Sequence, residues 1–111
     1  MVNETVAVLG ASGLTGSYLL PKLCDTYSRV VAISRRPLEH LYNNLDLVIT
    51  NFGDDWEVDL AGVHCLFIAF GTTRKAAGSA ERFRDIDLGI PLALARQAKA
   101  AGVKKLFWSR P

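Results

Sequence analysis

Short runs of apolar and β-branched residues recur along the chain without polar alternation, which is the pattern of strands buried on both faces. We expect a strand at each of five such runs, residues 5–9, 29–33, 45–50, 63–70 and 103–108. Apolar residues recur at helical spacing in two of the segments between these runs, residues 14–23 and 83–98. Gly102 follows the second segment and is a common residue just after a helix.

Strands that alternate with helices predict an α/β fold, because parallel strands need crossover connections. We therefore expect a Rossmann-like three-layer fold with a parallel sheet of five strands in the order 3-2-1-4-5. In that order the chain reverses direction between the first and fourth strands, and a ligand crevice opens there at the carboxyl ends of the strands. The 111 residues are expected to form a single domain.

Acidic residues gather between the third and fourth runs, at positions 54, 55, 57 and 59. Carboxylates stabilise the first turn of a helix because they face its positive end, so we expect a short helix there. A catalytic or metal-binding cluster is the alternative. The helix uses all of these carboxylates and leaves none for that role.

A glycine-rich loop joins the first strand to the first helix. Gly10 permits a tight turn, Gly13 lets the backbone approach a pyrophosphate, and Gly16 lets the helix pack closely on the strand. The helix amino terminus offers free N–H groups and Ser12 adds a hydroxyl. Because strand, loop and helix come in the required order, the loop is expected to bind a dinucleotide. A glycine turn that merely begins a helix is the alternative.

Polar residues follow the second strand, at the place where NAD sites usually hold Asp or Glu. Here that place holds Ser34, Arg35 and Arg36. A hydroxyl and two guanidinium groups can hydrogen-bond a 2′-phosphate, which a carboxylate would repel. The sequence therefore favours NADP as the cofactor, with NAD as the second choice. The alternative is that both arginines are solvated surface charges.

Several segments together carry the signature of a known family. They are Gly-Ala-Ser-Gly-Leu-Thr-Gly at 10–16, Ser-Arg-Arg at 34–36, Gly-Thr-Thr-Arg at 71–74, Ala-Gly-Ser at 77–79 with Phe83 and Asp87, and Ala-Ala-Gly-Val-Lys at 100–104. With them the chain resembles the atypical short-chain dehydrogenase/reductases. Within these it is most similar to the branch of the Tat-interacting tumour-suppressor oxidoreductase and its nucleoside-diphosphate-sugar epimerase-like relatives. The resemblance covers nearly all of the chain.

The resemblance implies an NAD(P)-binding domain and assigns its contacts by position. The pyrophosphate would contact Ser12, Gly13, Leu14 and Thr15, and the 2′-phosphate would contact Arg35 and Arg36. The adenine would contact Asn51 and Phe52, and the ribose nearer the nicotinamide would contact Gly71 and Thr72. Phe52 is equally well explained as a core residue at a strand end. A polar surface loop is the alternative for residues 72–74.

The resemblance also implies a catalytic Tyr-x-x-x-Lys helix and a substrate region, both after the fifth strand. We recognise no Tyr-x-x-x-Lys pair in this chain, which ends at Pro111. We therefore assign no catalytic residue and expect residues 1–111 to lack the usual C-terminal substrate region. The expected function is an NADP(H)-binding domain of an oxidoreductase-family protein, or its N-terminal half. A non-catalytic nucleotide-sensing or protein-interaction module is the alternative.

Composition and charge indicate which classes of binding partner and which locations to expect. Lys and Arg number 13 against 11 Asp and Glu, so no basic surface for nucleic acid is expected. The apolar runs are too short for a membrane span, and a signal-peptide pattern is absent at the start. Cys24 and Cys65 lack metal-ligand spacing, so we expect a cytoplasmic protein without a metal.

The fifth strand is the last strand of the predicted sheet and contains Phe107 and Trp108, so a homodimer through this edge is a further expectation.

Overall fold

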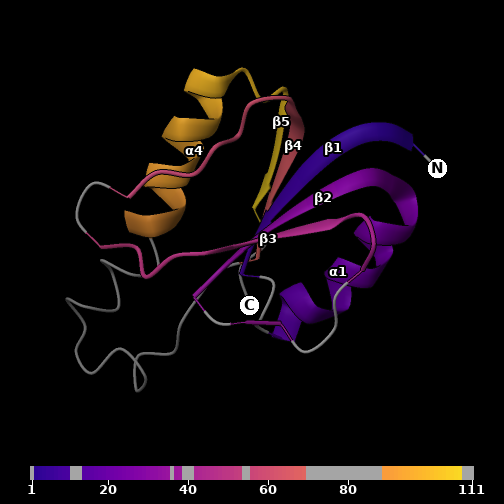
Figure 1. The fold of residues 1–111 in the computed structure, drawn as a ribbon. Coiled ribbons are helices and arrows are strands. Elements are labelled where there is room, and N and C mark those ends of the chain that lie inside the picture. Colours follow the sequence, from indigo (N-terminus) through magenta and orange to yellow (C-terminus); the bar gives the residue numbers. More distant parts are fainter. Residues whose placement is uncertain are drawn as a thin grey trace.

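The computed structural model describes residues 2–10, 14–35, 37–38, 42–53, 56–69 and 89–108, and only the backbone of residues 14–17. Its elements are β1 (Val2–Leu9), α1 (Leu14–Thr26), β2 (Tyr27–Ser34), β3 (Leu45–Ile49), β4 (Val63–Ile68), α4 (Ile90–Ala101) and β5 (Lys105–Trp108). All strand pairs are parallel, in the order β3-β2-β1-β4-β5. Helices α1 and α4 cover opposite faces of the sheet, which gives the predicted three-layer α/β fold (Figure 1).

The central strands are buried on both faces because their residues alternate between two apolar layers. In β1, Val6 and Val8 pack in the layer under α1, whereas Ala7 and Leu9 pack in the layer under α4. All four side chains are 0% exposed. Strand β2 repeats the alternation over residues 30–33. Since neither face of these strands is open, a polar ligand can reach them only at their ends.

Backbone hydrogen bonds join the carboxyl ends of the strands to one another. The N–H of Gly10 donates to the carbonyl of Ile33 at 3.1 Å, which ties the turn after β1 to the last residues of β2. The N–H of Ala69 donates to the carbonyl of Leu9 at 2.9 Å, which ties the end of β4 to β1. The three neighbouring strands therefore end together at one edge of the sheet.

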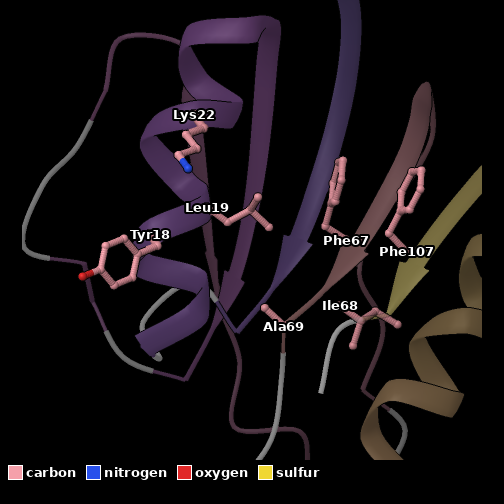
Figure 2. Close-up of a pocket in the computed structure, with 7 residues that line it drawn as sticks. All are labelled: Tyr18, Leu19, Lys22, Phe67, Ile68, Ala69 and Phe107. Atoms are coloured by element: carbon pink, nitrogen blue, oxygen red, sulfur yellow. The ribbon is translucent and has the colours of Figure 1, made fainter. Parts of the chain in front are cut away.

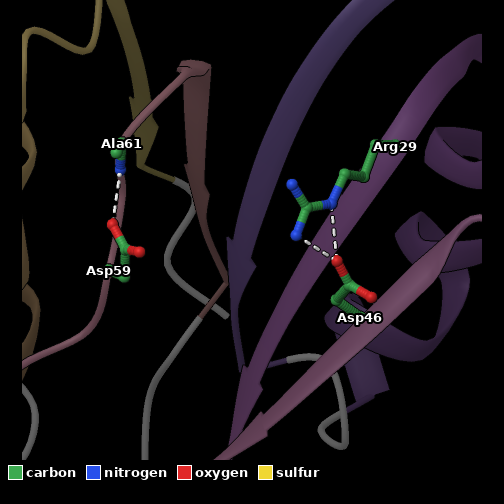
Figure 3. Close-up of polar contacts among 4 residues, drawn as sticks. All are labelled: Arg29, Asp46, Asp59 and Ala61. Carbon is green, nitrogen blue, oxygen red and sulfur yellow. Dashed lines mark hydrogen bonds and ion pairs between the residues drawn. The ribbon is translucent and has the colours of Figure 1, made fainter.

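Surface polar contacts support the strands away from this edge. Arg29 of β2 and Asp46 of β3 form an ion pair across the two strands (Figure 3). Their side chains are 57% and 53% exposed, so the pair contributes at most about 1 kcal/mol. Before β4, the Asp59 carboxylate accepts a hydrogen bond from the N–H of Ala61 at 3.0 Å (Figure 3). This bond fixes the turn that leads into the strand.

The helix predicted around the acidic residues does not form in the described part of that segment, residues 56–60. Instead, the Gln97 side chain on α4 accepts from the N–H of Val58 at 2.9 Å and donates to the carbonyl of Trp56 at 3.1 Å. A side chain that pairs with an irregular backbone removes the need for helical hydrogen bonds there. The prediction of a helix is therefore wrong for these residues, and positions 54 and 55 lie outside the described ones.

Other element boundaries differ from the predictions by a few residues. The third strand ends at Ile49 and the fourth at Ile68, while the fifth begins at Lys105. Helix α4 is described from Ile90, and the earlier part of its predicted stripe lies outside the described residues. Among the elements that are described, no helix is both long and apolar enough to cross a membrane.

Candidate functional site

The candidate site lies at the carboxyl edge, by which we mean the last residues of β1, β2, β3 and β4 and the residues that directly follow them. The structure brings Gly10, Ser34, Arg35, Asn51 and Phe52 to this edge. The backbone of three further predicted residues forms the start of α1: Leu14, Thr15 and Gly16. The remaining predicted residues lie outside the described ones: Ser12, Gly13, Arg36, Gly71 and Thr72.

Gly10 makes the turn that leads from β1 toward α1. Its φ of +88° lies in the left-handed region, where a side chain would add steric strain. Its N–H is held by the carbonyl of Ile33 at 3.1 Å, so the turn stays in register with β2. A glycine at this position agrees with the predicted tight turn ahead of the helix.

Ser34 is the last residue of β2 and Arg35 directly follows it, and the two differ in exposure. Ser34 is 2% exposed, and its carbonyl accepts a hydrogen bond from the N–H of Thr50 at 3.0 Å. Arg35 is exposed at the bend that follows. Of these two residues, Arg35 is therefore the one whose side chain a ligand from solvent can contact, and that side chain is charged.

Asn51 and Phe52 form a tight polar turn after β3. The Asn51 amide oxygen accepts from the N–H of Gly53 at 3.0 Å, and the Thr50 hydroxyl accepts from the N–H of Phe52 at 3.1 Å. Phe52 has a φ of +54°, which is uncommon for a residue with a side chain. The local hydrogen bonds hold the backbone in this turn.

The Phe52 ring is half-buried at the margin of the layer under α4. It meets the Trp56 ring edge to face, with centroids 4.8 Å apart and planes at 87°. This packing agrees with a core role for Phe52, which was the alternative to an adenine contact. An adenine contact through the rest of the ring stays a prediction.

An apolar pocket of about 290 Å³ lies between α1 and the pair β4–β5 (Figure 2). Its lining residues are Tyr18, Leu19, Lys22, Phe67, Ile68, Ala69 and Phe107. The rings of Phe67 and Phe107 stand side by side on neighbouring strands, 5.2 Å apart and 15° from parallel. This face of the two strands therefore presents aromatic surface that α1 does not cover.

Tyr18 and Lys22 are four residues apart on α1, so a Tyr-x-x-x-Lys spacing does occur in the chain. Sequence reasoning missed it, although the spacing itself is visible there. The pair lies before β2, not after β5 where the resemblance places a catalytic pair. Tyr18 is 71% exposed and points away from Phe67 and Phe107 in Figure 2. We therefore assign this pair no acid/base role.

The two cysteines are free and lie away from the carboxyl edge, in the layer under α1. Burial raises the pKa of the Cys24 thiol, and the charge of Asp25 raises it further. Burial also raises the pKa of Cys65, with a smaller lowering effect from Lys105 and a smaller raising effect from Glu4. Both thiols are thus neutral at neutral pH and poor nucleophiles.

An open parallel sheet in this order, with a glycine turn after β1, defines a Rossmann-like protein of the dinucleotide-binding class. The family model of the NAD dependent epimerase/dehydratase family matches residues 6–110. The chain belongs to this family.

Relatives of the chain are about twice its length. It is 38% identical to protein HTATIP2 of Rattus norvegicus over 111 residues, which covers 94% of this chain and 46% of that protein. It is 37% identical to protein FMP52-1, mitochondrial, of Scheffersomyces stipitis over 103 residues, which covers 87% of this chain and 46% of that protein. The chain therefore spans about half the length of the curated relatives it matches.

Solved structures confirm the fold. MoeE5 in complex with UDP-glucuronic acid and NAD superposes with a TM-score of 0.76 at 21% identity, over 96% of this chain and 36% of that one. The uronate dehydrogenase of Agrobacterium tumefaciens superposes with a TM-score of 0.77 at 17% identity, over 98% of this chain and 41% of that one. At these identities the likeness shows the Rossmann-like fold alone.

The names of several relatives bear on location. The FMP52 proteins of Scheffersomyces stipitis, Debaryomyces hansenii and Lodderomyces elongisporus are all named mitochondrial. The prediction of a cytoplasmic location is therefore wrong. It rested on free cysteines and short apolar runs, which indicate a reducing, aqueous compartment and do not distinguish one such compartment from another.

Proposed function

We propose that residues 1–111 form one nicotinamide-dinucleotide-binding domain that prefers NADP(H) to NAD(H) and serves an oxidoreductase. The observation that carries the preference is the exposed Arg35 at the end of β2, where NAD sites usually hold a carboxylate. A guanidinium there can form charge-assisted hydrogen bonds with a 2′-phosphate. The NAD in the complex of MoeE5 supports the wider cofactor class.

The geometry of the carboxyl edge supports one continuous site for the two phosphate groups. The Gly10 to Ile33 hydrogen bond holds the turn after β1 against the end of β2. Neighbouring strands lie about 5 Å apart, so the glycine loop and Arg35 start from adjacent positions on the edge. We propose that the loop of residues 10–16 meets the pyrophosphate while Arg35 and Arg36 meet the 2′-phosphate.

The chain spans about half of its relatives' length, so we propose that it corresponds to their cofactor-binding half. Residues 1–111 would then hold the dinucleotide, and the substrate region would come from the further length that those relatives have. On this proposal a mitochondrial location like that named for the FMP52 relatives applies to the protein as a whole.

Calorimetric titration of NADPH and NADH into the wild type and into variants tests the cofactor proposal. We expect tighter NADPH binding, and a loss of about 1.5–3 kcal/mol in NADPH affinity for Arg35→Ala or Arg36→Ala, because each removes charge-assisted bonds. NADH affinity should change little. Arg96→Ala is the matched control, since Arg96 is an exposed arginine on α4. Equal losses for both cofactors would show that these arginines do not recognise the 2′-phosphate.

A second candidate is a module that binds another protein chain, which the exposed apolar face of β5 favours. Phe107 is 53% exposed on this edge strand, and Phe67 on β4 extends the same surface. Leu106 is 45% exposed on the opposite face of the strand. Trp108 instead packs against the layer under α4. Because an edge strand with apolar side chains readily pairs with another strand, we propose a homodimer through β5.

Analytical ultracentrifugation tests this second candidate. We expect wild-type association at micromolar concentration and a monomer for Phe107→Ser, because the substitution removes a ring from the centre of the exposed surface. Leu92→Ser is the matched control, since Leu92 is 44% exposed and belongs to α4, not to β5. A wild type that stays monomeric, or a Phe107→Ser variant that still associates, would rule out this dimer.

A further inference from the structure

We propose that Gln97 is a positioning residue for the adenosine side of the carboxyl edge. This inference rests on the proposed dinucleotide-binding function. It concerns a residue of α4 that lies far along the chain from every predicted cofactor contact. Gln97 acts through the irregular segment of residues 56–58, and that segment supports the Phe52 ring.

The Gln97 side chain holds the segment at two points. Its amide oxygen accepts from the N–H of Val58 at 2.9 Å, and its amide nitrogen donates to the carbonyl of Trp56 at 3.1 Å. Both bonds are partly buried. One amide thus bridges two backbone groups of a segment that has no helix or strand of its own. An apolar side chain at this position would leave both groups without these bonds.

Trp56 connects this segment to the turn after β3 through a contact with the Phe52 ring. Its ring packs edge to face on Phe52 with centroids 4.8 Å apart, in the geometry that aromatic pairs prefer. Phe52 itself sits at a φ of +54°. A conformation of this kind persists only where the surroundings hold it. Local hydrogen bonds hold the backbone of this turn, the Trp56 ring holds the Phe52 ring, and Gln97 holds the backbone at Trp56.

The turn also connects to the predicted 2′-phosphate contact. The N–H of Thr50 donates to the carbonyl of Ser34 at 3.0 Å, directly before Arg35. The Thr50 hydroxyl in turn accepts from the N–H of Phe52 at 3.1 Å. A displaced Phe52 turn would therefore disturb the adenine contact first and the end of β2 second. Both belong to the adenosine half of the cofactor.

Titration of 2′,5′-ADP, which carries the adenine and the 2′-phosphate, tests this role. Gln97→Met keeps the length and helix propensity of the side chain and removes both hydrogen bonds. We expect a roughly tenfold weaker affinity for Gln97→Met. Arg96→Met introduces the same methionine at the preceding position of α4, and this variant should bind 2′,5′-ADP as the wild type does. Gly102→Ala, which strains the end of the same helix, should also leave affinity unchanged when measured well below its Tm.

A double-mutant cycle with Phe52→Ala separates positioning from general destabilisation. If Gln97 acts through the Phe52 ring, Gln97→Met should cause little further loss of 2′,5′-ADP affinity in the Phe52→Ala background. Fluorine NMR with fluorotryptophan gives a second measurement, in which Gln97→Met should shift the Trp56 resonance more than that of Trp108.

The outcomes separate the inference from the function on which it rests. If the wild type does not bind 2′,5′-ADP or NADPH, the proposed function fails and the inference fails with it. If the wild type binds and Gln97→Met binds equally well, only the inference is overturned. Equal losses with and without the Phe52 ring would also overturn it, because the effect would then not pass through that ring.

Discussion

A substitution at Gly10 separates the backbone strain of the turn from its role in binding. Gly10 has a φ of +88°, and Gly102 has a φ of +87° at the end of α4. An added Cβ at either position would meet a positive φ, which residues with a side chain rarely adopt. Only Gly10 lies at the carboxyl edge. Gly10→Ala and Gly102→Ala thus form a matched pair of variants.

The expected loss of stability is similar for both variants. A residue with a Cβ in the left-handed region costs about 1–2 kcal/mol, and the reduced entropy of the unfolded chain offsets part of this. A net loss of about 1 kcal/mol lowers the Tm of a domain of this size by on the order of 5 °C. At Gly102 no atom lies within 4 Å of an added Cβ, so strain is the whole cost there.

Binding should distinguish the two variants. In Gly10→Ala, relief of the strain rotates the turn and weakens the hydrogen bond from residue 10 to the carbonyl of Ile33. We expect NADPH affinity to fall at least tenfold, or about 1.4 kcal/mol, whereas Gly102→Ala should bind as the wild type does. Thermal unfolding and calorimetric titration measure the two effects. Equal Tm losses with unchanged NADPH affinity in Gly10→Ala would refute the proposed role of this turn.

The remaining predictions concern the framework of the fold. Leu94→Ala should lower the free energy of unfolding by about 2–5 kcal/mol in urea titrations, because Leu94 is 0% exposed in the layer under α4. Arg29→Ala should cost less than about 1 kcal/mol in the same assay, since its ion pair with Asp46 is exposed. Burial raises the pKa values of the Cys24 and Cys65 thiols above the ordinary value of 9.0. The unfolded chain therefore loses these protons first, and the free energy of unfolding should fall as the pH rises above about 9.0. Replacing both cysteines with alanine should flatten that fall, and an unchanged slope would contradict this origin.

The sheet could be predicted because its buried strands are uninterrupted runs of apolar residues. Residues 6–9 and 30–33 are apolar at every position, and only a strand covered on both faces needs that pattern. The order of the strands then follows from right-handed crossovers. Gly10 could be assigned to a turn because a glycine between a buried strand and a helix is typical of the tight turn that joins them.

The segment after β3 could not be predicted in the same way. Its acidic residues indicated a helix start, but its backbone is held by Gln97, some 40 positions later in the chain. A glutamine on a helix carries no sequence signal for such a contact. The half-buried place of Phe52 depends on the same tertiary packing, through Trp56. Local patterns therefore located the edge of the site, while long-range contacts shape its adenosine side.

A titration of NADPH followed by ¹H–¹⁵N NMR tests the central claim most directly. If the carboxyl edge binds the dinucleotide, the amide resonances of Gly10, Arg35 and Phe52 should shift in a saturable way. The amides of Gly62 and Gly102, which precede β4 and β5 at the opposite ends of the strands, should stay in place. Shifts confined to the opposite ends, or no shifts at all at millimolar NADPH, would contradict the account.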